Sequence, residues 1–277
     1  MDYRELLKDK KRIVIKIGSS SITYEDTKKL NYKKLERLVR ILCDIKNTGK
    51  DVVLVSSGAI AVGRQTVGIR KRSNDLAEKQ ACAAIGQCRL MMTYQRLFAE
   101  YNQLTAQVLL TKYTMANDES RNNAANTFEE LFKLDAIPVV NENDTVSTYE
   151  IEFGDNDRLS ALVSALIGAD LLILLSDIDG LFTDDPNVNP DARFIELVPE
   201  INNDYRNMAK GVSSDVGTGG MSTKLAAATI ATDAGADMVI ANSENVGVID
   251  EIMEGKNVGT LFLAHKDHNF NIHDFLD

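Results

Sequence analysis

The chain has few of the side chains that most often act as nucleophiles or soft metal ligands. Its 277 residues include 3 Cys, 3 His and no Trp. The cysteines fall in apolar helical patterns without metal-ligand spacing, which favours reduced core thiols and a cytoplasmic protein: Cys43, Cys82 and Cys88. The histidines lie together near the end of the chain, where a solvated tail is favoured over a metal site: His265, His268 and His273.

Long hydrophobic runs are also missing. No apolar stretch approaches the roughly 18 residues that a membrane-spanning helix requires. The first residues, MDYRELLKDKKR, do not have the pattern of a signal peptide. We therefore expect a soluble protein without a membrane partner.

Positive charge is in short supply. The chain has 31 Lys and Arg against 41 Asp and Glu, a net charge of -10, which argues against nucleic acid as the main partner. Residues 1–50 are an exception, since they are rich in Lys and Arg at helical spacing. A solvated helix face explains this pattern better than contact with RNA or a membrane does.

What the chain does contain is a regular alternation of short apolar runs and longer helical patterns. The runs are rich in Val, Ile and Leu without alternation, as in strands buried on both faces, and cover residues 12–17, 51–56, 105–110, 137–141, 170–176, 237–241 and 260–264. Helical patterns cover a segment around Leu35–Ile45 and residues 75–100, 118–133, 156–168, 222–234 and 246–254. This order predicts an α/β fold with a mainly parallel sheet covered on both sides, a three-layer αβα sandwich.

Two further features concern the organisation of the chain. The polar stretch 177–215 is predicted to contain a hairpin excursion from the sheet. An internal division is expected near residue 168, between an N-terminal and a C-terminal lobe that share one sheet.

In such folds, ligands bind beyond the carboxyl ends of the strands, and polar clusters follow four of the predicted strands. The first cluster begins with Lys16 and continues through Gly18 to three serines. A lysine at the end of a buried strand is costly unless it meets an anion, although it could also extend into solvent. The second cluster is Ser56–Ala59, a small-residue loop that could serve as a helix cap or close around phosphates with the first.

The third cluster joins Asn141–Asp144 with Gly154–Asp157. One Asx residue as a helix cap accounts for one of these polar side chains, and binding of a ligand or metal explains the others better. The fourth cluster is Ser176-Asp177, with Asp179-Gly180 beyond it. Its spacing excludes an EF-hand, and Asp177 could instead contact a nucleotide.

The most informative stretch is GTGGMSTK, Gly217 to Lys224, which runs into an alanine-rich helical pattern. Its glycines let the backbone approach an anion, and the start of a helix offers unpaired N–H groups. The stretch is neither a Walker A loop, since Leu225 follows the lysine, nor a dinucleotide motif, since Ser222 replaces the third glycine. It indicates a phosphate site of another class.

Taken together, the clusters favour phosphoryl transfer. No Cys or His stands in any of them, so covalent catalysis and histidine acid–base catalysis lack their residues. Phosphoryl transfer needs mainly alignment and positive charge around the moving group. Two lysines and a magnesium ion could supply that charge.

These motifs resemble those of the glutamate 5-kinases within the amino acid kinase family. KIGSS, VSSGAIAVG, NENDTV, GDNDRLSAL, LLSDIDGLFTDDP and GTGGMSTK occur in this order over about residues 12–264. The resemblance implies an amino acid kinase domain at residues 1–265, with acid bound by residues 1–168, ATP bound by residues 169–265 and a tail at 266–277. It implies transfer of the ATP γ-phosphate to the side-chain carboxylate of L-glutamate, the first step of proline biosynthesis.

The resemblance also assigns roles to individual residues. Lys16 and Lys224 would neutralise the transferring phosphoryl group, and Asp157 would hold both lysines in place. Glutamate would be bound by Ser57, Asp144 and Asn156. ATP would be bound by Lys16, Ser176, Asp177, Thr218, Gly219, Gly220, Met221, Ser222, Thr223 and Lys224. Gly18 and Gly58 would allow close approach of the backbone to the phosphoryl oxygens.

Further implications concern partners and regulation. Mg²⁺ would enter mainly through the ATP phosphates, proline would act as a feedback inhibitor, and the chain would form a homo-oligomer, a dimer or a tetramer. Many relatives carry a C-terminal PUA domain, and the tail HKDHNFNIHDFLD indicates a form without it. Two other functions stay open, namely a kinase for acetylglutamate or aspartate and a nucleotide-binding regulator without catalysis.

Overall fold

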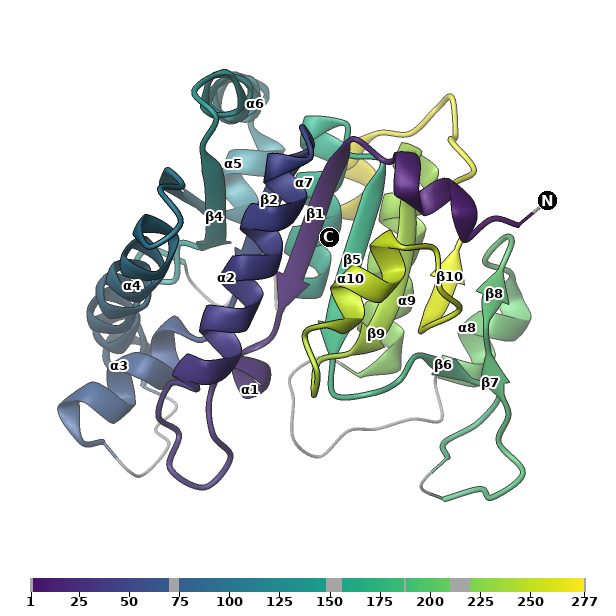
Figure 1. Cartoon of the computed structure of the whole chain (residues 1–277), viewed down its shortest axis with the longest axis horizontal. Helices are drawn as coiled ribbons and strands as arrows, with labels where there is room; N and C mark the ends of the chain where they lie inside the picture. Colours follow the sequence, from purple (N-terminus) through teal and green to yellow (C-terminus); the bar gives the residue numbers. More distant parts are fainter. Residues whose placement is uncertain (1, 70–74, 148–155, 187, 210–219, 277) are drawn as a thin grey trace.

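A central sheet organises the chain, as seen in a computed structural model that describes residues 2–69, 75–147, 156–186, 188–209 and 220–276. The described residues form an eight-stranded sheet in the order β3-β4-β2-β1-β5-β9-β10-β8 (Figure 1). Its strands are β1 (Arg12–Ile17), β2 (Asp51–Ser56), β3 (Thr105–Leu110), β4 (Ile137–Glu142), β5 (Leu171–Ser176), β8 (Leu197–Val198), β9 (Asp237–Asn242) and β10 (Thr260–Phe262).

The pairing is parallel from β3 through to β9, and β10 runs antiparallel to β9. The seven strands expected from apolar runs are all present, with shifts of one or two residues at their ends. The mainly parallel sheet is thereby confirmed. The short edge strand β8 was not predicted, because two residues carry no periodic signal.

Helices cover both faces of the sheet, so the three-layer expectation is confirmed. One face packs against α5 (Lys112–Ala116), α6 (Asp118–Lys133), α7 (Asn156–Ile167) and α9 (Met221–Ala234). The other face packs against η1 (Glu5–Asp9), α2 (Tyr32–Asn47), α4 (Leu76–Ala99) and α10 (Val248–Met253), and Figure 1 shows α2 and α10 in front of the sheet. Shorter helices are α1 (Ser19–Ile22), α3 (Ala59–Val67), α8 (Asn203–Ala209) and η2 (Ile272–Phe275).

Side-chain alternation along β1 decides where its polar residue points. Ile13, Ile15 and Ile17 pack in the core on the α2 side, whereas Val14 packs on the α7 side. Because successive side chains point to opposite faces, Lys16 lies on the same face as Val14. A buried strand thus places one ammonium group toward α7 and α9.

The hairpin expected in residues 177–215 is present, as β6 (Leu181–Phe182) pairs antiparallel with β7 (Phe194–Ile195). Two other expectations were wrong. Cys88 is exposed, because it lies on the face of α4 opposite the buried stripe. The tail is not simply solvated, since Leu276 is buried and Phe270 and Phe275 pack against the core.

The division near residue 168 stays a prediction, since one sheet runs through both halves. Within the described residues, no helix combines the length and the apolar character needed to cross a lipid bilayer.

Candidate active site

The polar residues expected to gather do lie at one edge of the sheet. Lys16, Ser56, Asn141 and Ser176 occupy the last residues of β1, β2, β4 and β5, which all run in the same direction. The helices α7 and α9 begin at this edge, with Asp157 and Lys224 in their first turns. Parallel strands therefore bring groups far apart in the sequence to one place.

Three charged side chains form the centre of the site. Asp157 Oδ1 forms an ion pair with Lys16 Nζ. Asp157 Oδ2 lies 3.0 Å from Lys224 Nζ and accepts a hydrogen bond from it. Asp157 is 1% exposed, Lys16 8% and Lys224 5%. One buried carboxylate thus holds two ammonium groups, and these three side chains together carry a net charge of +1.

The electrostatics of the cluster favour its charged form. Burial alone raises the pKa of Asp157, but the ammonium groups of Lys16 and Lys224 outweigh it and hold this pKa below the ordinary aspartate value. Lys224 stands in the first turn of α9, where the helix dipole disfavours a cation. A bound anion would offset that cost and be attracted by both ammonium groups, so the cluster is suited to hold a phosphoryl group.

Two glycines shape the loops around the lysines. A Cβ atom on Gly18 would stand 3.6 Å from Lys16 Nζ, so this glycine keeps the space beside the ammonium open. Gly58 has a φ of +109°, a conformation that side chains disfavour, and it caps the start of α3. Both positions fit a backbone that must come close to a ligand.

On the side of β2 and β4, neutral side chains are linked by hydrogen bonds. Asn156 Nδ2 donates to Ser57 Oγ at 2.7 Å and to Asn141 Oδ1 at 2.8 Å. Asn141 Nδ2 in turn donates to Gln87 Oε1 of α4 at 2.9 Å. This linked set joins α4, β4, α7 and the loop after β2, and it contains two of the residues predicted to bind the acid.

The third predicted acid ligand, Asp144, is half-buried in the turn that follows β4. Gly154 and Asp155, part of the same predicted cluster, lie outside the described residues, as does all of 148–155.

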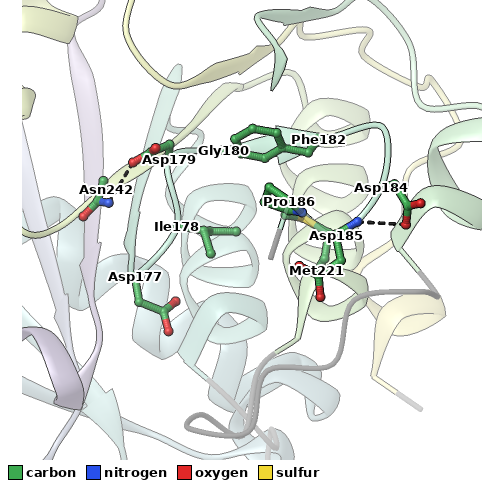
Figure 2. A pocket seen from close by; sticks show the side chains of 10 residues that line it. All are labelled: Asp177, Ile178, Asp179, Gly180, Phe182, Asp184, Asp185, Pro186, Met221 and Asn242. Atoms are coloured by element: carbon green, nitrogen blue, oxygen red, sulfur yellow. Dashed lines mark hydrogen bonds between the residues drawn. The ribbon is translucent and has the colours of Figure 1, made fainter. Parts of the chain in front are cut away.

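On the side of β5 and β9, the edge opens into a pocket of about 260 Å³. Figure 2 shows its lining, which combines apolar and acidic side chains: Asp177, Ile178, Asp179, Gly180, Phe182, Asp184, Asp185, Pro186, Met221 and Asn242. Two of these lining residues are joined by a hydrogen bond, in which Asn242 Nδ2 donates to Asp179 Oδ1 at 2.7 Å. The mixture suits a flat apolar ring that carries polar groups at its edge.

Predicted nucleotide residues lie beside this pocket. Asp177 and Met221 line it, and Ser176 Oγ donates to Asp177 Oδ1 at 2.9 Å. Gly220 caps α9, Thr223 Oγ1 donates to the Gly220 carbonyl at 2.8 Å, and Ser222 is exposed. Gly217, Thr218 and Gly219 lie outside the described residues.

Sequence reasoning missed Gln87 and gave no role to Asn141. The signal for Gln87 was present, because it is a polar residue in the stripe formed by Ala83, Leu90 and Tyr94 of α4. A buried polar side chain on such a stripe requires a partner. The partner stands on β4 and could not be located without the fold.

The fold and the site can now be compared with known proteins. The chain matches the amino acid kinase family over residues 11–242. It belongs to this family. The assignment confirms the expectation of a kinase that uses ATP.

Relatives agree with this assignment over nearly the whole chain. Glutamate 5-kinase from Clostridium perfringens is 49% identical over 95% of this chain and 99% of its own length. The enzyme of the same name from Carboxydothermus hydrogenoformans is 51% identical, again over 95% of this chain but over 70% of its own length. The chain thus has the length of the shorter relatives.

Solved structures share the fold at low sequence identity. UMP kinase from Ureaplasma parvum superposes with a TM-score of 0.62 at 16% identity, over 92% of this chain and 99% of its own. Isopentenyl phosphate kinase from T. acidophilum superposes with a TM-score of 0.62 at 15% identity, over 91% of this chain and 99% of its own. These structures support the three-layer fold and say nothing of the substrate.

Proposed function

We propose that this enzyme transfers the γ-phosphoryl group of ATP to the side-chain carboxylate of L-glutamate, the first step of proline biosynthesis. The observation that carries the proposal is the buried cluster of Lys16, Asp157 and Lys224 at the edge of the sheet. The similarity to the glutamate 5-kinases described above supports glutamate as the acceptor.

The chemistry explains why the site needs no general base. A glutamate side chain has a pKa near 4.3, so its carboxylate is already ionised at neutral pH. One carboxylate oxygen attacks the γ-phosphorus, the bond to the β–γ bridging oxygen breaks, and ADP leaves with the bonding electrons. Both reactants are anions, so the main obstacle is their repulsion, which two ammonium groups reduce.

In this proposal the two lysines belong to different secondary-structure elements. Lys16 reaches the phosphoryl group from the end of β1, and Lys224 reaches it from the first turn of α9. Asp157 sets the distance between the two lysines and keeps the site from carrying two unbalanced charges. Gly18 and Gly58 provide backbone N–H groups close to the phosphoryl oxygens.

The acid is bound on the β2 and β4 side and ATP on the β5 and β9 side. Ser57, Asn156 and Asp144 bind glutamate, with the carboxylate of Asp144 facing the α-ammonium group. Ser176, Asp177 and the segment from Thr218 to Lys224 bind the nucleotide beside the pocket of Figure 2. Residues 1–168 thus carry the acid site and residues 169–265 the ATP site.

Magnesium would enter as part of the nucleotide. Within the described residues, no group of three His, Cys, Asp or Glu side chains could hold a metal ion. Mg²⁺ is commonly held by substrate phosphates with only one or two carboxylates from the protein. The residues described here fit Mg²⁺ bound mainly by ATP, with carboxylates such as Asp177 nearby.

Three finer elements of the proposal rest on the family resemblance. Proline, the end product, inhibits the enzyme near the glutamate pocket, the chain assembles as a homo-oligomer, and it works in the cytoplasm. Activity titrated with proline and the molar mass in solution measure the first two directly.

The strongest competing acceptors are acetylglutamate and aspartate. A carboxylate at Asp144 suits the free α-ammonium of glutamate or aspartate, whereas the acylated nitrogen of acetylglutamate is neutral. Aspartate is one methylene shorter, so its side-chain carboxylate would fall short of the lysines. ADP release measured with each acid in parallel separates these acceptors.

The direct test is to trap the product. Enzyme incubated with MgATP, glutamate and hydroxylamine is expected to form glutamyl hydroxamate, with one ADP released for each. If the folded enzyme forms no hydroxamate under these conditions, the proposal is wrong. ATP binding by calorimetry without turnover of any acid would favour a nucleotide-binding regulator instead.

A further inference from the structure

The buried amide of Gln87 lies at the end of the hydrogen-bonded set that reaches the acid side of the site. The chain of donors and acceptors runs Gln87 Oε1 to Asn141 Nδ2, then Asn141 Oδ1 to Asn156 Nδ2. Gln87 is 8% exposed and Asn141 3% exposed, so neither amide can readily exchange its partner for water.

The direction of this chain matters because an amide has two different ends. Its nitrogen donates and its oxygen accepts, so the atom that a partner presents determines which end of the amide faces it. In this structure Gln87 presents Oε1, and Asn141 accordingly has its nitrogen toward α4 and its oxygen toward Asn156. Both N–H bonds of Asn156 are then used, by Asn141 and by Ser57. The remaining polar atom of Asn156 is Oδ1, an acceptor.

An acceptor at this place has a chemical consequence for the ligand. The α-ammonium group of an amino acid is a donor with a full charge, and an acceptor Oδ1 can bind it. If Asn156 were turned over, its N–H groups would face that ammonium and repel it. The polarity of one side chain therefore decides whether a free amino group is favoured.

The backbone explains how Gln87 keeps its position. Helices α3 and α4 pack at van der Waals contact, since a Cβ on the neighbouring Gly86 would stand 1.7 Å from the Ala59 carbonyl oxygen. Two turns further along α4, Tyr94 Oη and Ser56 Oγ share a hydrogen bond of 2.8 Å. Helix α4 is thus hydrogen-bonded to the ends of both strands, to β2 through Tyr94 and to β4 through Gln87.

We propose that Gln87 is a positioning residue for the acid substrate: through Asn141 it orients Asn156 so that the Asn156 oxygen accepts from the substrate's α-ammonium group. The proposal rests on the proposed function for the identity of that substrate. Gln87 itself contacts Asn141, so its effect on the ligand is indirect.

The test compares two substitutions of similar shape. Gln87→Met removes the acceptor, and we expect the KM for glutamate to rise roughly tenfold, as for the loss of one hydrogen bond to a charged group. The KM for ATP and kcat should stay within about twofold of the wild type. Gln87→Glu restores an acceptor oxygen and should recover most of the lost glutamate affinity. Gln95→Met, at an exposed position of the same helix, serves as the matched control.

A second acid sharpens the same comparison. Glutarate has the two carboxylates of glutamate and lacks the ammonium group. The preference of the wild type for glutamate over glutarate, as a ratio of kcat/KM, should shrink about tenfold in Gln87→Met. A purely structural role of Gln87 would lower both values together and leave the ratio unchanged, which would overturn the proposal.

A spectroscopic readout keeps this test separate from the proposed function. In ¹⁵N-asparagine-labelled protein without substrate, Gln87→Met should shift the side-chain amide signals of both Asn141 and Asn156, while Gln95→Met leaves them in place. Unchanged Asn156 signals would contradict the proposal whatever the substrate is. Failure of the wild type to bind or phosphorylate glutamate would instead overturn the proposed function, and the amide signals would still decide the role of Gln87.

Discussion

The two sides of the proposed catalytic cluster are built in different ways. On the side proposed to bind the acid, Ser57, Asn141 and Asn156 are neutral and joined to each other by hydrogen bonds, with Asn141 buried and the other two half-buried. On the nucleotide side, the edge of the sheet opens into a pocket whose lining alternates carboxylates with apolar side chains (Figure 2). Asp157 and the two lysines lie between these sides.

The difference matches what each ligand demands. A small amino acid offers few atoms, so its recognition depends on a few polar groups held in a fixed orientation. A nucleotide offers a large ring and several phosphates, so it can be bound by area and by charge. The acid side is therefore expected to be sensitive to single atoms, and the nucleotide side to tolerate change.

The largest effect is expected at the cluster that both sides share. Lys224→Ala should lower kcat by about 10³-fold, because it removes a preorganised positive charge from the transition state. ATP affinity should fall much less, since the charge matters most while the phosphoryl group moves. Steady-state kinetics and calorimetry check this, with the exposed Lys33→Ala as control. Equal losses in kcat and ATP affinity would mean that Lys224 only binds ATP.

A pair of substitutions tests the two sides directly. Asn156→Ala should raise the KM for glutamate about 10- to 100-fold and leave the KM for ATP within about threefold, because it removes groups that face the acid in the proposed function. Met221→Ala should raise the KM for ATP by only several-fold and spare glutamate, because it removes apolar contact area from the pocket. If Asn156→Ala raised mainly the KM for ATP, or Met221→Ala mainly the KM for glutamate, the division into two sides would be wrong.

The helix contact behind the acid side offers a third test. Gly86→Ala forces α3 and α4 apart, because its Cβ would meet the Ala59 carbonyl oxygen at 1.7 Å. The free energy of unfolding should fall by about 1–3 kcal/mol, the usual cost of overpacking. The KM for glutamate should rise more than that for ATP, since Ala59 directly follows the loop of Ser57 and Gly58. Ala84→Gln, at an exposed position of the same helix, is the control for both measurements.

The smallest effect concerns pH. The folded-state pKa of Asp157 lies below its ordinary value of about 3.9, so its ion pairs stabilise the fold above that pH. This contribution is lost as pH falls from about 4 through the folded-state pKa. The difference in unfolding free energy between the wild type and Asp157→Asn should therefore shrink as pH drops below 4, as urea titrations at several pH values can show. A difference that stays constant with pH would argue against the charged pair.

Much of this arrangement could be predicted from the sequence, for identifiable reasons. Apolar runs such as residues 171–176 are buried on both faces, so they mark central parallel strands and hence the edge where ligands bind. Lys16 was recognisable because a lysine ending such a strand needs an anion. That Lys16, Asp157 and Lys224 lie close together could be predicted, because their clusters were expected at one edge of the sheet. Their roles in catalysis stay proposals.

Other features depend on contacts that no local pattern carries. Cys88 and Gln87 are neighbours on one helix, yet the first is exposed and the second buried, because packing against α3 and β4 decides which side faces inward. The tail looked polar, but Phe270, Phe275 and Leu276 pack against the core. Which residues pack against each other across such sequence distances can be known only once the fold is known.

The central claim is that a glutamate carboxylate oxygen attacks the γ-phosphorus within the cluster of Lys16, Asp157 and Lys224. It can be tested with glutamate labelled with ¹⁸O in its side-chain carboxylate, turned over with MgATP and hydroxylamine. Hydroxylamine attacks the acyl carbon, so the phosphate released should carry one ¹⁸O atom from the carboxylate, as measured by the isotope shift in ³¹P NMR. Phosphate that carries no ¹⁸O, in the presence of normal ADP release, would show that water rather than glutamate receives the phosphoryl group and would contradict the account.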